Sequence, residues 1–147
     1  MNPTPTLLTE LTRAEEQVML VLWQRGPSFA KNVQAALPAQ PALAYTTVST
    51  IIRLLVQKGF VGYEAFGRTH RYAPLIKQDD YRYFLLHKLV NTYFGGSFGA
   101  LLGFYTRTAN LDAAQLGQLV GQAYQQLGPA PTPASGSGST LPPTQLS

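Results

Sequence analysis

Cysteine is absent from this chain of 147 residues. Its absence excludes disulfide bonds, zinc fingers and metal sensors that bind their ion through thiolates. No apolar run reaches the roughly 18 residues that a membrane-spanning helix requires. The first residues, MNPTPTLLTE, lack the basic stretch and apolar core of a signal peptide. Zero cysteines fit the cytosol and also a disulfide-free periplasmic protein, but the lack of a signal peptide and of a spanning helix predicts a soluble, cytoplasmic protein.

Catalytic and metal-binding patterns are also missing. The chain has two histidines, His70 and His87, in different predicted elements. Neither has a serine or carboxylate at the spacing of a catalytic or metal site. Gly95-Gly96-Ser97 lacks the lysine of a phosphate-binding loop, so we interpret it as a break between helices. We therefore expect no catalytic residues, no metal, no cofactor and no enzyme activity.

Positive charge is concentrated in the first half of the chain. The formal net charge is +4. All of this excess lies before Gln78, because the three basic and three acidic residues after it balance each other. Such an asymmetry favours a polyanion as the partner, but charge alone leaves nucleic acid and a neutral function about equally open.

The first half of the chain shows the element order of a winged helix-turn-helix domain. Thr12 and Glu15 have the T-x-x-E spacing of a capping box, and Gly26-Pro27 ends the apolar helix that follows. The predicted elements are helices over 12–25, 30–37 and 45–58, a very short strand at Phe29, and strands over 60–66 and 69–74 with a turn near Gly67. Three helices followed by a two-stranded hairpin indicate a winged-helix domain.

The third predicted helix carries the clearest functional pattern. Val48, Ile51, Ile52 and Leu55 repeat at the spacing of a buried helix face. The other sides carry short polar residues and one arginine: Thr46, Thr47, Ser49, Thr50, Arg53 and Gln57. Hydroxyls near a helix N-terminus can enter the major groove of DNA, and Arg53 can bind a phosphate or a guanine. The alternative is an ordinary solvated face, but threonine is a poor helix former and such faces usually carry Glu and Lys.

The hairpin turn suggests a second contact with nucleic acid. Gly67-Arg68 and Arg71 fit a wing tip that lies along the DNA backbone or in a minor groove. The alternative interpretation is a hairpin whose arginines are solvated.

The second half of the chain predicts helices over 78–94, from 98 to about 107, and from about 113 to 127, each with apolar residues. These helices are too few and too short to form a second core, so we expect a partner chain to cover their apolar stripe. The alternative is that they fold back on the winged-helix domain. The predicted dimer residues are Phe84, Leu85, Leu89, Phe94, Leu101, Phe104, Leu116, Leu119, Val120 and Ala123.

The predicted fold is therefore mainly α-helical with a small β-hairpin wing. A winged helix-turn-helix domain covers 11–76 and a helical dimerisation region covers 77–128. Residues 129–147 are rich in Pro, Gly, Ser and Thr, with little to bury, and predict a disordered tail.

Four short motifs resemble the family of penicillinase and methicillin-resistance repressors. They are Leu22-Trp23 before Gly26-Pro27, Ala44-Tyr45-Thr46-Thr47-Val48 with Lys58-Gly59, Arg71-Tyr72-Ala73-Pro74-Leu75, and Phe94-Gly95-Gly96-Ser97. The resemblance runs from about residue 11 to 127. It implies a homodimeric transcriptional repressor that binds an operator with dyad symmetry, one winged helix to each half-site.

The resemblance also implies a route to derepression. In the best-known members a membrane sensor metalloprotease signals, and the repressor is cut in its dimerisation region at an asparagine–phenylalanine bond. The matching peptide is Gly103-Phe104, with glycine in place of that asparagine. Leu54 stands where relatives often have a second basic residue, which implies fewer DNA contacts or a different operator.

Two other functions remain open from the sequence. A winged helix can serve as a protein-interaction module without binding DNA. A small molecule in an aromatic cleft between the two halves could also gate a regulator.

Overall fold

The structure, a computed structural model, describes residues 8–127. The elements in this range are α1 (Arg13–Arg25), β1 (Ser28–Phe29), α2 (Ala30–Ala36), α3 (Tyr45–Gln57), β2 (Val61–Phe66), β3 (Thr69–Pro74), α4 (Gln78–Tyr93), α5 (Phe98–Thr108) and α6 (Ala113–Gln126). Their ends agree with the predicted ones to about one residue, the usual uncertainty of a helix end. The predicted tail lies outside the described residues. The chain divides into two compact units after Gly96, each described below by itself.

The predicted capping box at the start of α1 is confirmed. The Thr12 hydroxyl accepts a hydrogen bond from the Glu15 amide at 3.2 Å, and the Glu15 carboxylate accepts one from the Thr12 amide at 2.9 Å. The two bonds satisfy amides that a helix N-terminus otherwise leaves unpaired. They fix where α1 begins, so its apolar side faces the core.

The core of the first unit lies between α1, α2 and α3. The predicted buried face of α3 is confirmed, since Val48, Ile51, Ile52 and Leu55 are all buried. They pack with Val18, Met19 and Leu22 of α1, Val33 of α2, and Phe60 and Val61 beside the sheet. Burying one such side chain contributes about 1.5–3 kcal/mol. The opposite side of α3 is thereby left to face solvent.

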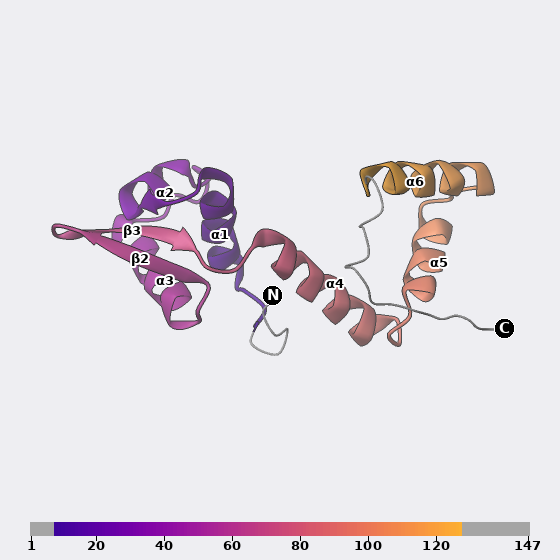
Figure 1. Cartoon of the computed structure of the whole chain (residues 1–147), viewed down its shortest axis with the longest axis horizontal. Helices are drawn as coiled ribbons and strands as arrows, with labels where there is room; N and C mark the ends of the chain where they lie inside the picture. Colours follow the sequence, from indigo (N-terminus) through magenta and orange to yellow (C-terminus); the bar gives the residue numbers. More distant parts are fainter. Residues whose placement is uncertain (1–7, 128–147) are drawn as a thin grey trace, which may run out of the picture. The chain divides into compact units, whose positions relative to one another are not determined.

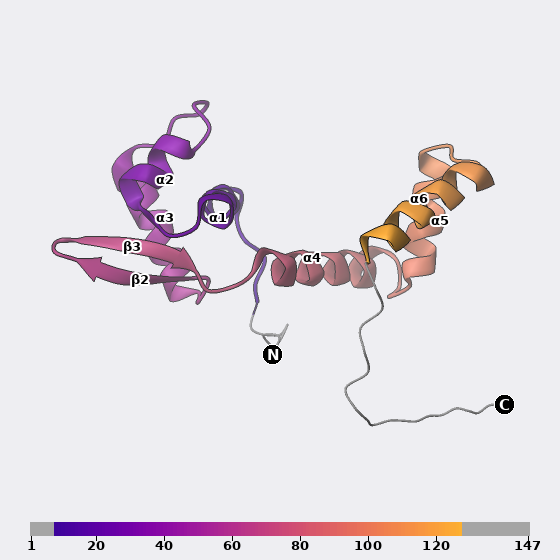
Figure 2. The same ribbon diagram turned by 45° about the horizontal axis from the view of Figure 1, so that its top comes forward.

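A three-stranded antiparallel sheet completes the winged-helix fold, with the strand order β1-β3-β2. The very short strand predicted at Phe29 is confirmed, because β1 pairs Phe29 with Arg71. The two-residue loop between β2 and β3 places Gly67 at φ +63°, a conformation that glycine adopts without strain. The closed end of this hairpin reaches past α2 and α3 in both views (Figure 1 and Figure 2). This projecting end is the wing.

α4 packs against the first unit through an aromatic residue. The Tyr81 ring is buried, with its centroid 5.9 Å from that of Trp23 and 5.8 Å from that of Phe60. Its hydroxyl accepts a hydrogen bond from the Leu11 amide at 2.8 Å. α4 therefore lies in the first compact unit. The domain boundary after residue 76 stays a prediction. Periodicity shows that a helix has an apolar side but does not show what covers that side.

The second unit contains α5 and α6. Ser97 caps α5 through the Ala100 amide at 3.0 Å. α6 begins at Ala113, as predicted, after a capping box between Asp112 and Gln115. Neither helix contains a buried residue. These helices are thus fixed at their ends, but the described residues of this unit form no core of their own.

No helix within residues 8–127 has the length and apolar character needed to cross a lipid bilayer.

Candidate nucleic-acid interface

The polar residues predicted to contact DNA line the outer side of α3. Thr46, Thr47, Thr50, Arg53 and Gln57 are exposed and Ser49 is half-buried. α3 contains no acidic residue. Phosphate groups would therefore meet no carboxylate from this helix.

A short hydrogen-bond chain orders the middle of this face. The Thr50 hydroxyl donates to the Thr46 carbonyl at 3.0 Å, and Arg53 Nη2 donates to the Thr50 hydroxyl at 3.1 Å. A guanidinium has five N–H donors, so this bond leaves Arg53 several for another acceptor. The arginine is positioned along the helix and can still bind a phosphate or a guanine edge.

The two predicted wing arginines lie in different surroundings. Arg68 is exposed in the hairpin turn. Arg71 donates to the Glu64 carboxylate at 3.0 Å, and its guanidinium carbon lies 5.0 Å from the centre of the Phe66 ring. Both of these partners are in β2, on the sheet face that Arg71 shares with Phe29. The structure therefore engages Arg71 within the hairpin and does not bring it together with Arg53.

Strand alternation explains this separation. β2 and β3 pair Glu64 with Arg71, and Tyr63 with Tyr72. Because successive side chains of a strand point to opposite faces, His70 and Tyr72 share one face and Arg71 lies on the other. Charge alone does not distinguish Arg68 from Arg71, whereas the register of β2 and β3 places Arg71 beside Glu64.

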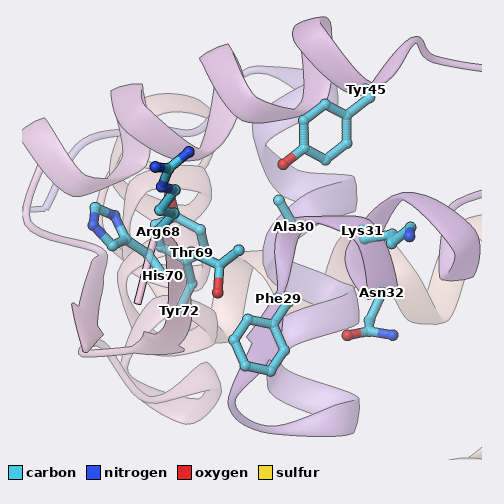
Figure 3. Close-up of a pocket in the computed structure, with 9 residues that line it drawn as sticks. All are labelled: Phe29, Ala30, Lys31, Asn32, Tyr45, Arg68, Thr69, His70 and Tyr72. Carbon is cyan, nitrogen blue, oxygen red and sulfur yellow. The ribbon is translucent and has the colours of Figure 1, made fainter. Parts of the chain in front are cut away.

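A hollow of about 660 Å³ joins the wing to the first turns of α2 and α3. Figure 3 shows wing residues on one side, α2 residues on the other, and Tyr45 between them with its hydroxyl toward the hollow. The lining residues are Phe29, Ala30, Lys31, Asn32, Tyr45, Arg68, Thr69, His70 and Tyr72. None of them is acidic. The start of α3 and the wing turn thus border one continuous surface.

Of the lining residues, only Arg68 is among the contacts predicted from the sequence; those it does not include are Phe29, Ala30, Lys31, Asn32, Tyr45, Thr69, His70 and Tyr72. Burial raises the pKa of Tyr72, and neighbouring Tyr45 adds to this effect while Arg53 opposes it. Tyr45 of α3 and Tyr72 of β3 line the same hollow. Alternation along β3 could have selected His70 and Tyr72, but Lys31 becomes a neighbour only through tertiary packing.

The surface around the hollow has unbalanced positive charge. Ion pairs within the described chain join Lys58 to Glu15, Arg71 to Glu64, Arg82 to Asp79, and Lys88 to Glu10. No carboxylate of residues 8–127 pairs with Lys31, Arg53 or Arg68. These three cations are therefore available to a polyanion.

The residues predicted to form a dimer fall into two groups. Phe84 and Leu85 are half-buried against the core of the first unit. Phe94, Leu101 and Leu116 are also half-buried, whereas Leu89, Phe104, Leu119, Val120 and Ala123 are exposed. The exposed group leaves apolar side chains of α4, α5 and α6 at the surface.

The peptide matched to a family cleavage site lies inside a helix. Gly103 and Phe104 fall in the middle of α5, which runs from Phe98 to Thr108. Within residues 8–127 there is no group of three or more His, Asp or Glu side chains that could hold a metal ion.

Comparison with known proteins identifies relatives that are named as repressors and transcriptional regulators. A family model described as penicillinase repressor matches residues 11–123. The methicillin resistance regulatory protein MecI of Staphylococcus aureus (strain N315) is 24% identical over 110 residues, which cover 75% of this chain and 89% of MecI. The transcriptional regulator BlaI of Mycobacterium tuberculosis (strain H37Rv) is 42% identical over 74 residues, or 50% of this chain and 54% of BlaI.

Solved structures with similar regions include two of BlaI. One is a solution structure of the BlaI DNA-binding domain, with 27% identity, a TM-score of 0.45, and coverage of 55% of this chain and 94% of that chain. The other is monomeric Bacillus licheniformis BlaI in complex with the blaP half-operator, with 27% identity, a TM-score of 0.43, and coverage of 50% and 89%. Because the family model spans most of the sequence, the chain belongs to the penicillinase repressor family.

Proposed function

We propose that this protein is a cytoplasmic transcriptional repressor, without enzyme activity or cofactor, that binds operator DNA as a homodimer. The observation that carries the proposal is the continuous acid-free surface formed by α3, the wing turn and the hollow between them. The relatives support it, because they are named as regulators and one BlaI structure contains a half-operator.

In this proposal α3 is the recognition helix. Thr46 and Thr47 in its first turn, with Ser49 and Thr50 behind them, approach base edges and phosphates in the major groove. Arg53 binds a phosphate or a guanine, and Gln57 lies further along the groove. Arg68 of the wing contacts the backbone or a minor groove. Arg71 has a lesser part, because Glu64 and Phe66 already engage it.

The proposed dimer forms through the second half of the chain. α5 and α6 bury none of their residues, and Leu119 and Val120 are 40% and 54% exposed. A second copy would remove such side chains from water, which is the main driving force for association. Two recognition helices would then lie about 34 Å apart, or a multiple of that distance, on an operator with dyad symmetry.

Derepression in this proposal follows proteolysis. A membrane sensor metalloprotease would trigger cleavage at Gly103-Phe104 and so separate the dimer. Because this peptide bond lies within α5, the helix must open locally before a protease can bind it as an extended strand.

A mobility-shift assay tests the DNA-binding proposal. The full chain is titrated onto its own upstream DNA in the presence of excess unrelated DNA. Arg53→Ala should weaken the specific complex by about 10- to 100-fold, the effect of losing one base or phosphate contact per half-site. Thr47→Ala should weaken it as well, and neither variant should unfold the protein, because both side chains are exposed.

Arg82→Ala is the matched control. Arg82 is an exposed arginine of α4, paired with Asp79 and remote from α3 in the sequence. We expect this variant to bind as the wild type does. Equal loss in both variants would show only a dependence on net charge. The absence of any specific complex from a folded dimer would instead favour the protein-interaction module.

A further inference from the structure

His70 occupies a position that the proposed function does not use. It lies on β3 and is one of the residues that line the hollow, on the same side as Arg68 (Figure 3). Its imidazole is exposed. Neither of its ring nitrogens has a hydrogen-bond partner within residues 8–127. An imidazole in this place can therefore offer its N–H groups to a group that enters the hollow.

Two tyrosines hold the His70 ring in place. Tyr63 stacks on it with ring centroids 4.4 Å apart and planes inclined by 20°. Tyr72 meets it edge-on at 6.0 Å and 77°. The Tyr63 ring covers one flat face of the imidazole and leaves the nitrogens at its rim. The face of Tyr63 also favours a positive charge placed over it.

The charged residues that line the hollow with His70 are cations, Arg68 from the turn and Lys31 from α2. Arg53 of α3 influences the adjacent Tyr72. The remaining titratable neighbours are Tyr45, Tyr63 and Tyr72. The only carboxylate of the hairpin, Glu64, is paired with Arg71 on the opposite face. A phosphate that enters the hollow therefore meets cationic side chains and no carboxylate among the residues that line it.

The anion that fits this place is a phosphate of the DNA backbone. The hollow begins at Tyr45, the first residue of α3, and ends at the wing turn, so a strand leaving the groove read by α3 would pass it. We propose that His70 takes up a proton from solvent when an operator phosphate enters the hollow, so that operator affinity rises as the pH falls. This inference rests on the proposed function and adds to it a pH-dependent contact.

Linkage gives the size of the effect. Imidazole is the side chain that ordinarily changes charge between pH 5 and 8. If each wing gains one phosphate contact on protonation, the slope of log affinity against log salt should steepen by about 0.9 for each wing at low pH. Over the same range we expect the operator affinity to rise by about tenfold between pH 8 and pH 6.

The experiment measures the affinity of the full chain for its operator by fluorescence anisotropy, at pH 6 and pH 8 and over a series of salt concentrations. His70→Gln removes the titrating group and should bind with the weaker, pH-independent affinity of the wild type at pH 8. His70→Arg supplies a permanent charge and should bind at both pH values as the wild type does at pH 6. His87→Gln is the matched control, because it removes the other histidine from α4, and it should retain the pH dependence.

Two results would overturn the inference while leaving the proposed function intact. One is wild-type affinity that does not change between pH 6 and pH 8. The other is a pH dependence that survives in His70→Gln, whether or not it also survives in His87→Gln. Absence of specific binding at both pH values would overturn the proposed function itself, and this inference with it.

Discussion

Glu15 is a charged residue in the interior of the first unit, where it is 3% exposed. Its carboxylate accepts hydrogen bonds from the Thr12 amide at 2.9 Å and from Lys58 Nζ at 2.7 Å. Burial alone would raise the pKa of Glu15, but these bonds outweigh it and hold the pKa below its ordinary value. One carboxylate therefore caps α1 and also ties it to Lys58, which follows the last residue of α3.

Glu15→Gln should lower the free energy of unfolding at pH 7 by about 1–3 kcal/mol, because it removes the ion pair but keeps a capping acceptor. A carboxyl with a lowered folded-state pKa stabilises the fold above its unfolded-state pKa. That contribution is lost as the pH falls through the lowered value. Urea unfolding over a pH series should thus show wild type and variant converging in acid.

The control for Glu15 is the exposed pair of Glu10 and Lys88. Glu10→Gln should change the free energy of unfolding much less than Glu15→Gln does, because water and salt screen a surface pair. Equal effects of the two substitutions would argue against a special role for the buried carboxylate.

At the scale of single elements, the Tyr81 hydroxyl of α4 is the acceptor for a buried amide of the first unit. Tyr81→Phe keeps the packing against Trp23 and Phe60 but leaves the Leu11 amide without its acceptor. An unsatisfied buried N–H costs about 1–3 kcal/mol, which should appear in thermal or urea unfolding and as faster hydrogen exchange at Leu11. Tyr83→Phe is the control in the same helix, since Tyr83 is 59% exposed. A similar loss in both variants would contradict this account.

The wing allows a comparison between two arginines of one hairpin. Arg68→Ala should reduce operator affinity and lower the salt slope by about 1 for each protomer. Arg71→Ala should reduce affinity less, because its guanidinium is engaged by Glu64 and Phe66. Anisotropy titrations of both variants measure these operator affinities. A larger loss of affinity for Arg71→Ala than for Arg68→Ala would show that Arg71 is the main wing contact.

The elements themselves could be predicted because their signals are local. Thr12 with Glu15 and Asp112 with Gln115 mark helix starts through bonds across three residues. The hollow could not be predicted in this way. It brings Lys31, Tyr45 and His70 together from three elements, and no pattern along the chain records that packing. For the same reason, the sequence does not show that the apolar residues Phe84 and Leu85 of α4 pack on the core of their own chain.

At the scale of the whole molecule, DNA affinity should depend on assembly. Leu119→Asp places a charge on the exposed apolar side of α6, so it should weaken the proposed dimer and reduce operator affinity in parallel. Sedimentation and mobility shift together test this prediction. Leu20→Asp is the control, because Leu20 is an exposed leucine of α1 in the other unit. An intact dimer of Leu119→Asp would refute the assignment of α6 to the interface.

The salt dependence of the complete complex provides a second test at this scale. A dimer that neutralises about eight phosphates should lose affinity with a slope near −7 in log affinity against log salt. A flat dependence would contradict an interface built on Lys31, Arg53 and Arg68.

The lack of buried residues in α5 and α6 has a consequence for how this protein responds to dilution. Helices of 11 and 14 residues are at best marginal alone in water. If a second copy supplies their core, their folding becomes bimolecular, and their melting temperature should increase with protein concentration while that of the first unit stays constant. Calorimetry at several concentrations would then resolve two transitions, and only the melting temperature of α5 and α6 would change with concentration. At a low concentration of the protein in the cell, the proposed dimer would dissociate, and both operator binding and the folding of these helices would then be lost together.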